Sequence, residues 1–355
     1  MSEQRGKEIS GVTTNTTAEK KVLVLFCGGT LVMEKDERGS LVTPELDRAI
    51  RNLLTMETRL GELAELEVAH VDNIDSANIR PEHWDRVAEL VSEKYGEYDG
   101  FVITHGTDTM AYTASALSFV LGNLGKPVVL TGSQIPGSQI ESDARRNFVN
   151  AVRVATTDVS GVMVAFDRKL ILGARATKVS ESKLDAFDGI NGGLLGEIRV
   201  DLRLTDAAKP RHDGAIDLRK GFESNVAIVT LAPGMPLHVL ERLVDSGVKG
   251  LVLRGFGTGN VAYEHHDAVA RACRAGLPVV VTTQGLQGAT MMHSYDLGRR
   301  LLDVGVIQGY DMGTECIVTK LMWALRRAGT VDAVRELLHT NFCGEIRVPR
   351  SERAA

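Results

Sequence analysis

Two threonine-containing runs carry the strongest chemical signal in this sequence. Thr30 lies in the run Cys-Gly-Gly-Thr-Leu (27–31), and Thr107 precedes Asp108 in the run His-Gly-Thr-Asp-Thr (105–109). A threonine hydroxyl becomes a useful nucleophile when a neighbouring base or cation helps to remove its proton. A carboxylate can bind a substrate ammonium group, while the second threonine and nearby backbone N–H groups face a developing oxyanion. These residue types suit a site in which one hydroxyl attacks and the others position substrate and stabilise charge.

Three further polar residues could join this site, and each candidate also has a structural alternative. Lys178 follows a segment too apolar for a solvated loop, so it could form a partly buried pair with Asp108 and ease deprotonation of a hydroxyl; alone it would be a surface lysine. Asp75 and Ser76 follow a strand-like stretch and offer an acceptor and a hydroxyl, or a helix cap. Capping is also the alternative for Asp108, and a turn bonded to its own backbone is the alternative for Thr30.

Neither the glycine pair nor the neighbouring histidine predicts a separate function. Gly28-Gly29 does not complete G-x-G-x-x-G, because the next glycine, Gly39, lies beyond a charged segment, and no G-K-S/T follows for a phosphate loop. His105 looks like a general base, but a histidine at a strand end is more often a satisfied core residue. We therefore leave it out of the site.

The segments that must carry these residues alternate as strands and helices, which is typical of a parallel sheet with helices on both faces. Strands predicted at 21–26 and 99–104 end directly before the two threonine runs, at the sheet edge where open α/β sheets bind ligands. The other elements predicted for the first half are helices at about 111–124 and 143–156, strands at 67–71, 128–131 and 161–166, and a β-rich stretch at 169–179. Two threonines and one carboxylate would then converge on one crevice.

The alternation continues in the second half of the chain, after a charged stretch with no sustained apolar period. Strands are predicted at 226–231, 250–253 and 278–282, and helices at 237–245, 267–275, 315–327 and 331–338, the last capped by Thr330. We therefore expect five segments: a disordered tail at 1–20, a catalytic α/β domain at 21–200, a linker at 201–222, a smaller α/β domain at 223–348 and a tail at 349–355.

Composition indicates a soluble globular protein that acts on a small molecule. The 355 residues are 43% hydrophobic and 25% charged, and the net charge of −5 argues against nucleic acid or an anionic membrane as partner. Cys27, Cys273, Cys316 and Cys343 form neither a C-x-x-C pair nor a metal-ligand spacing, so we expect free thiols and no metal. The first twenty residues lack the apolar core of a secretion signal, and no later run could span a bilayer, which favours the cytoplasm.

Taken together, these runs resemble the L-asparaginase family, most closely its cytoplasmic type I branch. The resemblance covers the chain from about residue 21 to 348. It is carried by Gly28-Gly29-Thr30-Leu31, the run from Gly100 to Ala114, Thr131-Gly132-Ser133-Gln134-Ile135-Pro136, Thr177-Lys178, the run from Leu253 to Asn260, and Thr282-Thr283-Gln284.

The resemblance implies a two-domain fold: a larger amino-terminal domain with a mainly parallel sheet flanked by helices, and a smaller carboxyl-terminal α/β domain. It implies hydrolysis of L-asparagine to L-aspartate and ammonia, without a metal or organic cofactor, by a homodimer or a dimer of dimers. By this analogy Thr30 is the nucleophile that forms a β-aspartyl enzyme. Thr107, Asp108 and Lys178 form a second triad that supports proton transfer and substrate placement.

By the same analogy Asp75 and Ser76 hold the α-carboxylate and α-amino groups of the substrate, with Asp108 paired to the ammonium. Such an arrangement suits amide hydrolysis, because the site must stabilise a tetrahedral oxyanion and deliver a proton to departing ammonia. Fixing both charged ends of a small zwitterion would place its side-chain amide over Thr30.

Several positions depart from the family pattern. Cys27 replaces the threonine that usually opens the first motif, and Ser40 stands where a mobile segment usually supplies a tyrosine that closes over the nucleophile; residues 31–44 contain no tyrosine. Ala77 replaces a glutamine or serine that touches substrate in some relatives, and Gly285 replaces a cysteine of the allosteric asparagine site found in some type I relatives. Either another group activates the nucleophile, or turnover is slower or directed at a different amide.

Two alternative functions remain open. The asparaginase-like subunit of the tRNA-dependent glutamine amidotransferase shares these motifs but normally carries an extra amino-terminal domain, for which 20 residues before the first strand are too few. A non-catalytic amino-acid sensor would keep the pocket and lack the closing tyrosine.

Overall fold

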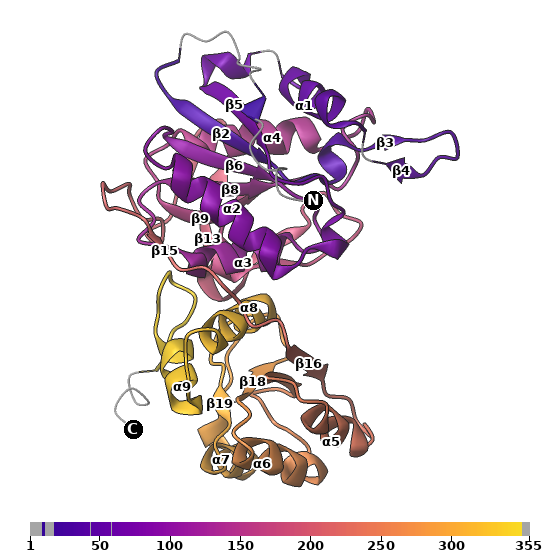
Figure 1. Ribbon diagram of the computed structural model, residues 1–355, viewed down its shortest axis with the longest axis vertical. Helices are drawn as coiled ribbons and strands as arrows, with labels where there is room; N and C mark the ends of the chain where they lie inside the picture. The colour runs from indigo at the N-terminus through magenta and orange to yellow at the C-terminus, as the bar shows by residue number, and fades with distance from the viewer. Residues whose placement is uncertain (1–8, 11–17, 43, 58, 350–355) are drawn as a thin grey trace, which may run out of the picture. The chain divides into compact units, whose positions relative to one another are not determined.

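The computed structural model describes residues 9–10, 18–42, 44–57 and 59–349, and the chain folds into two compact units (Figure 1). The first unit ends at Lys220 and the second begins at Gly221. Within the described residues, no helix combines the length and the apolar character that crossing a membrane requires.

The first unit is built on a nine-stranded sheet of order β1-β5-β2-β6-β8-β9-β10-β13-β14. Its strands are β1 (Ile9–Ser10), β2 (Lys21–Phe26), β5 (Glu65–His70), β6 (Gly100–Thr104), β8 (Pro127–Thr131), β9 (Gly161–Phe166), β10 (Lys169–Leu172), β13 (Leu194–Ile198) and β14 (Leu202–Leu204). The five strands from β5 to β9 are parallel, whereas β1 and the strands from β10 to β14 pair antiparallel. Apolar runs such as Val-Val-Leu in β8 are buried throughout, as parallel strands covered on both faces must be.

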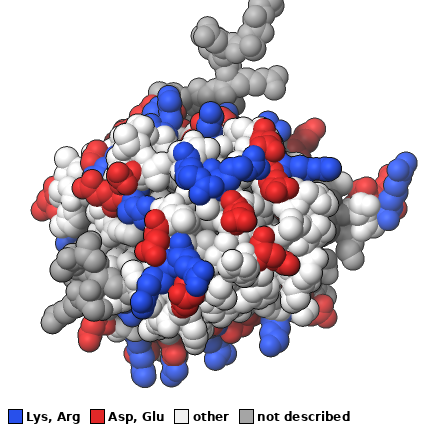
Figure 2. Space-filling model, turned by 90° about the horizontal axis from the view of Figure 1, so that it is seen from below, with Lys and Arg blue, Asp and Glu red and all other residues white. Residues whose placement is uncertain are grey.

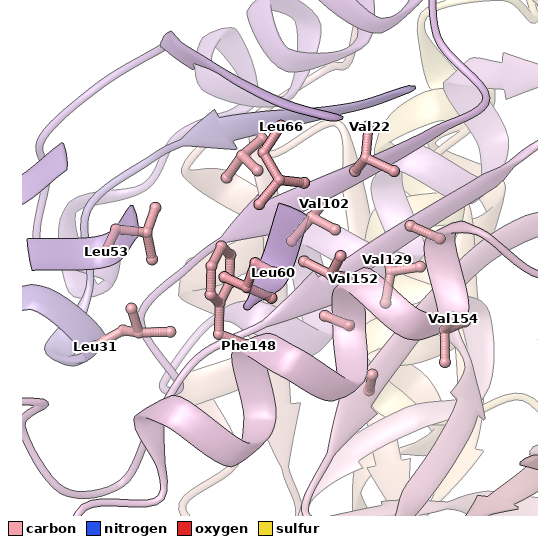
Figure 3. Close-up of a cluster of buried hydrophobic side chains, with 14 of the residues drawn as sticks. Val22, Leu31, Leu53, Leu60, Leu66, Val102, Val129, Phe148, Val152 and Val154 are labelled. Atoms are coloured by element: carbon pink, nitrogen blue, oxygen red, sulfur yellow. The ribbon is translucent and has the colours of Figure 1, made fainter. Parts of the chain in front are cut away.

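Helices cover both faces of this sheet (Figure 1). They are α1 (Leu46–Thr55), α2 (Pro81–Lys94), α3 (Met110–Val120) and α4 (Ala144–Ala155). Side chains alternate across each strand, so Val22 and Val102 pack with Phe148 and Val152 of α4 on one face (Figure 3), while α3 lies against the other. The helix predicted to reach residue 124 ends at Val120, because the next two residues form the short strand β7 (Leu121–Gly122).

Of the stretch predicted as a linker, 201–222, residues 201–220 lie within the first unit and the last two belong to the second. The stretch contains β14 and the short strand β15 (Asp217–Leu218), which pairs with β7. Arg211 attaches it further, because its guanidinium donates to the carbonyls of Thr157 at 2.7 Å and Ala155 at 2.9 Å. The predicted tails lie mostly outside the described residues, although Ile9–Ser10 pair with β5 as β1.

The second unit holds a four-stranded parallel sheet of order β16-β17-β18-β19. Its strands are β16 (Val226–Thr230), β17 (Gly250–Gly255), β18 (Val279–Thr283) and β19 (Ile307–Gln308), and its helices are α5 (His238–Asp245), α6 (His266–Arg274), α7 (Asp296–Asp303), α8 (Thr314–Leu325) and α9 (Val331–His339). The Thr330 hydroxyl caps α9 by accepting from the Ala333 N–H at 3.2 Å, as predicted. Figure 2 shows basic and acidic side chains interspersed over the displayed face.

A buried ion pair joins α8 to the segment after α9. Lys320 and Glu345 are both fully buried, with Nζ and Oε1 2.6 Å apart. Lys320 Nζ also donates to the carbonyls of Leu338 and Thr340, and the Glu345 carboxylate accepts from two backbone N–H groups. Every charge in this pair is therefore compensated by a hydrogen-bonding partner.

Candidate active site

The two threonine runs meet because β2 and β6 are parallel neighbours, with Phe26 paired to Thr104. Beyond the strand ends, Gly29 has φ +98°, and a Cβ at this position would lie only 2.6 Å from the Gly106 nitrogen. A side chain there would collide with backbone, which cannot move aside. Glycine therefore lets the loop that carries Thr30 lie directly on the loop that carries Thr107.

The loop after β5 reaches the same edge of the sheet. A Cβ on Gly106 would lie 2.5 Å from the Ser76 Oγ, and the Thr109 hydroxyl donates to the Ser76 carbonyl at 2.7 Å. Ser76 is thus buried against the Thr107 run. Asp75 is exposed, and its carboxylate accepts from the Ala77 N–H at 2.9 Å, so it caps the 3-10 turn η3 (Ser76–Asn78).

Lys178 brings Thr107 and Asp108 together. It ends β11 (Ala176–Lys178), and its Nζ donates to Thr107 Oγ1 at 2.9 Å and to Asp108 Oδ1 at 2.8 Å. The lysine side chain is only 11% exposed, so it is not an ordinary surface lysine. Asp108 does not cap the following helix, because α3 begins at Met110 with Thr109 as its N-cap.

Glu181 is the third partner of this lysine, and sequence reasoning missed it. Its Oε2 accepts from Lys178 Nζ at 2.8 Å, although the side chain is 80% exposed. The Gln134 amide holds its loop by donating to the carbonyls of Ser180 and Lys183, both at 3.3 Å. The available signal was a carboxylate three residues after a candidate lysine.

These contacts determine which groups donate a proton and which accept one. The Lys178 ammonium has three N–H donors, and each is directed at one oxygen, of Thr107, Asp108 and Glu181. Because Thr107 Oγ1 accepts from the lysine, its own proton is free to be donated to another group. The arrangement can therefore supply a proton to a bound molecule and replace it from the ammonium.

Thr30 stands apart from this cluster. It begins the 3-10 turn η1 (Thr30–Val32), its carbonyl accepts from the Met33 N–H at 3.1 Å, and its hydroxyl makes no hydrogen bond with any residue that the structure describes. The alternative of a turn threonine bonded to its own backbone is therefore not observed. The hydroxyl remains available to an incoming group.

Cys27, which precedes this loop, is buried and unreactive. Burial, assisted by the negative charge of Asp72, raises the pKa of its thiol to about 12. A thiol with this pKa stays protonated at neutral pH and is a poor nucleophile. The cysteine therefore does not compete with Thr30 for that role.

A short hairpin occupies the region where the resemblance places a closing tyrosine in other proteins and Ser40 in this chain. It consists of β3 (Glu34–Lys35) and β4 (Leu41–Val42), and at its tip Asp36 Oδ1 accepts from the Arg38 and Ser40 N–H groups at 2.9 and 2.8 Å. The tip is thus an ordered turn with Ser40 exposed at its end.

Comparison with known proteins identifies the family. Residues 21–209 match the family model of the asparaginase N-terminal domain, and residues 225–338 match that of the glutaminase/asparaginase C-terminal domain. The chain belongs to the asparaginase family. Both the family resemblance and the two-domain α/β fold predicted from the sequence are thereby confirmed.

Three related proteins illustrate the similarity. The chain is 39% identical to the L-asparaginase of Thermococcus kodakarensis, over 92% of this chain and 99% of that one. It also matches a solved structure of the thermostable L-asparaginase from Thermococcus kodakarensis with a TM-score of 0.86 and 37% identity, over 93% of this chain and 100% of that one. It is 36% identical to Escherichia coli L-asparaginase 1, over 92% of this chain and 98% of that one. It is also 35% identical to one subunit of the glutamyl-tRNA(Gln) amidotransferase of Pyrococcus abyssi, over 92% of this chain and 76% of that protein.

Among the described residues, no three His, Cys, Asp or Glu side chains are grouped so that they could hold a metal ion.

Proposed function

We propose that this chain hydrolyses the side-chain amide of L-asparagine to L-aspartate and ammonia. The observation that carries the proposal is the lysine bridge, in which Lys178 Nζ contacts the Thr107 hydroxyl at 2.9 Å and the Asp108 carboxylate at 2.8 Å. Two of the relatives described above are named L-asparaginases and match this chain over almost their whole length. The chemistry of the bridge and the names of these relatives support the same activity.

In the first step the Thr30 oxygen attacks the amide carbon and forms a tetrahedral oxyanion. The C–N bond then breaks, leaving a β-aspartyl ester on Thr30. The leaving nitrogen gains one proton and the Thr30 hydroxyl loses one. The leaving nitrogen takes its proton from Thr107, and Lys178 resupplies Thr107. The proton that Thr30 loses restores the Lys178 ammonium, so ammonia leaves and the lysine bridge ends the step unchanged.

In the second step water attacks the ester carbon. The bond from that carbon to the Thr30 oxygen breaks, and one proton of the attacking water passes to that oxygen. L-Aspartate leaves, and both threonines return to their starting state.

Oxyanion stabilisation is assigned to a backbone donor. The Thr107 N–H has no hydrogen-bond acceptor among the residues that the structure describes, although Thr107 itself is buried. A buried donor without a partner is costly, so it favours an incoming acceptor. We assign this N–H to the oxyanion of the tetrahedral intermediate.

The charged ends of the substrate are assigned to the neighbouring loops. The Asp108 carboxylate is 59% exposed, so one oxygen can bind the substrate ammonium while the other stays on Lys178. Asp75 is a second carboxylate for that ammonium, and the Ser76 hydroxyl is a donor for the α-carboxylate. Holding both ends fixes the amide relative to Thr30.

The location and assembly of the chain are part of the same proposal. The family resemblance supports a cytoplasmic homodimer or dimer of dimers that needs no cofactor. A solved structure 26% identical to this chain, with a TM-score of 0.75, is described as a probable cytoplasmic L-asparaginase from Campylobacter jejuni. Sedimentation analysis of the purified protein tests the assembly, and an active monomer would contradict it.

Ammonia release from L-asparagine, L-glutamine and D-asparagine tests the function. We expect L-asparagine to be preferred, and Thr30→Ala and Thr107→Val each to lose about a hundredfold or more in activity. Thr55→Val is the matched control, because that hydroxyl only bonds backbone carbonyls at the end of α1. Full turnover by Thr30→Ala would overturn the assignment of the nucleophile.

The two alternative functions give different results in the same assay. Binding of L-asparagine by calorimetry without ammonia release would favour an amino-acid sensor, which the absence of a tyrosine at residues 31–44 makes worth testing. Ammonia release from L-glutamine that depends on a second subunit and tRNA would favour the amidotransferase subunit, to which the chain is also similar.

A further inference from the structure

His105 lies directly before Gly106 and Thr107, and hydrogen bonds engage both nitrogens of its ring. Nδ1 is 2.7 Å from the Gly106 carbonyl oxygen, and Nε2 is 2.9 Å from the Thr113 hydroxyl in α3. The same hydroxyl accepts from Trp84 Nε1–H of α2 at 3.0 Å. The three side chains are almost completely buried, so water does not compete for these bonds.

The chemistry of the end groups gives this chain of hydrogen bonds one direction. A carbonyl oxygen only accepts, so His105 Nδ1 carries a proton, and an indole N–H only donates, so Trp84 donates to Thr113. Burial, with a smaller effect from His83, lowers the pKa of His105 to about 4, which leaves the ring neutral at pH 7. Nε2 is then an acceptor, and the Thr113 hydroxyl donates to it. Each of these groups has a matching partner.

The hydrogen bond from His105 Nδ1 to the Gly106 carbonyl fixes the orientation of one peptide group of the site. The Gly106 carbonyl and the Thr107 N–H belong to one planar trans peptide, so they point in opposite directions. When His105 Nδ1–H holds the carbonyl, the Thr107 N–H is directed away from the imidazole. That N–H is the donor without an acceptor among the described residues.

We propose that His105, Thr113 and Trp84 are positioning residues that hold the Gly106 carbonyl and thereby direct the Thr107 N–H to the developing oxyanion. This inference rests on the proposed hydrolysis of an amide. It assigns His105 no proton transfer, because both ring nitrogens are occupied and the ring stays neutral. The histidine acts through the peptide group between Gly106 and Thr107.

Two substitutions at His105 separate this role from simple filling of space. The amide nitrogen of His105→Asn can take the place of Nδ1 and still donate to the Gly106 carbonyl, whereas the longer side chain of His105→Gln places its amide where Nε2 lies. We expect His105→Asn to keep kcat within about tenfold of wild type and His105→Gln to lose about 10²-fold in kcat, which is typical for loss of one oxyanion donor. KM should change little in either variant. Equal losses in both, or better retention in His105→Gln, would overturn the proposal.

Thr113 gives a second comparison that does not depend on the fold of the His105 variants. Thr113→Ser keeps the hydroxyl and should retain kcat, whereas Thr113→Val removes the donor to Nε2 and should lose about tenfold or more. Trp84→Phe removes only the donor to Thr113, so it should lose less activity than Thr113→Val, because Thr113 can still donate to His105. A loss in Trp84→Phe as large as in Thr113→Val would contradict the proposed order of effects.

Nitrogen-15 NMR of labelled histidine tests the chain without turnover. Wild-type His105 should be protonated at Nδ1 and unprotonated at Nε2 between about pH 6 and 8, because its lowered pKa keeps the ring neutral there. A ring protonated at Nε2, or one that titrates in this range, would overturn the inference. Because this measurement needs no substrate, it separates failure of the hydrogen-bond chain from failure of the proposed amidase activity.

Discussion

Replacing Lys178 with methionine should greatly reduce turnover while leaving the fold intact. The substitution keeps a long apolar side chain and removes the ammonium that donates to Thr107, Asp108 and Glu181. We expect kcat/KM for L-asparagine to fall by about 10²–10⁴-fold, the usual range for a missing proton-transfer partner. Because each factor of ten corresponds to about 1.4 kcal/mol, this loss is roughly 3–5 kcal/mol of transition-state stabilisation.

The cost to stability should be much smaller than the cost to catalysis. The two carboxylate partners are 59% and 80% exposed, so solvent screens each ion pair to about 0–1 kcal/mol. We therefore expect the free energy of unfolding to change by less than about 2 kcal/mol in Lys178→Met. The assay is ammonia release at saturating and limiting L-asparagine, combined with urea unfolding followed by circular dichroism.

Lys169→Met is the matched control for this prediction. Lys169 Nζ also lies near two carboxylates, 3.0 Å from Asp185 and 3.6 Å from Asp188, on the same β-rich part of the chain. Its replacement should change kcat/KM by less than about threefold. If Lys178→Met keeps more than about a tenth of wild-type kcat/KM, or if both variants lose activity equally, the role assigned to the lysine bridge is refuted.

Two further predictions concern the contact between the Thr30 and Thr107 loops, and the buried ion pair of Lys320 and Glu345. Gly29→Ala should lose at least about a hundredfold in kcat, because its Cβ would lie 2.6 Å from the Gly106 nitrogen. Gly39→Ala is the control and should keep its activity, because Gly39 also has a positive φ, +79°, but a Cβ there would have no atom within 4 Å. Similar kinetics in the two variants would contradict the argument. Burial raises the pKa of the Glu345 carboxyl, but Lys320 and two backbone N–H donors together outweigh this effect and hold that pKa below its ordinary 4.5. The pair therefore stabilises the fold above pH 4.5, and this contribution is lost as the pH falls through the native pKa. Urea unfolding should show Glu345→Gln to be less stable by roughly 3–5 kcal/mol at pH 7 and to lack this acid-dependent loss; equal stability at pH 7 would contradict it.

Much of the fold was predictable because strands in a parallel sheet must be apolar along their whole length. Strands β2 and β9 follow the predicted ranges 21–26 and 161–166, since an uninterrupted apolar run signals burial on both faces. Helices α1, α2 and α7 were not predicted. In α2 the buried residues Trp84, Val87, Ala88 and Val91 recur at helical spacing with charged residues between them, an amphipathic pattern that was present in the sequence and was missed.

The candidate site was predictable in its residue types and only partly in its contacts. Thr107 and Asp108 could be placed at a strand end, and Lys178 could be suspected because an apolar stretch precedes it. The only signal for Glu181 was a carboxylate three residues after Lys178, which is weak because the side chain is 80% exposed. His105, which the sequence reasoning left out of the site, is buried and lies within hydrogen-bond distance of Thr113 and the Gly106 carbonyl.

By itself, the sequence determined the alternation of strands and helices, the family, and the residues that stand at the carboxyl ends of the strands. Those features depend on local periodicity and on motifs that are contiguous in the chain. Only the tertiary structure decided that Lys178 reaches Thr107 across 71 positions and that Trp84 and Thr113 fix the orientation of His105. The physical reason is that a hydrogen bond requires two atoms to lie within about 3 Å, and for groups far apart in the chain that distance is set by the packing of whole elements.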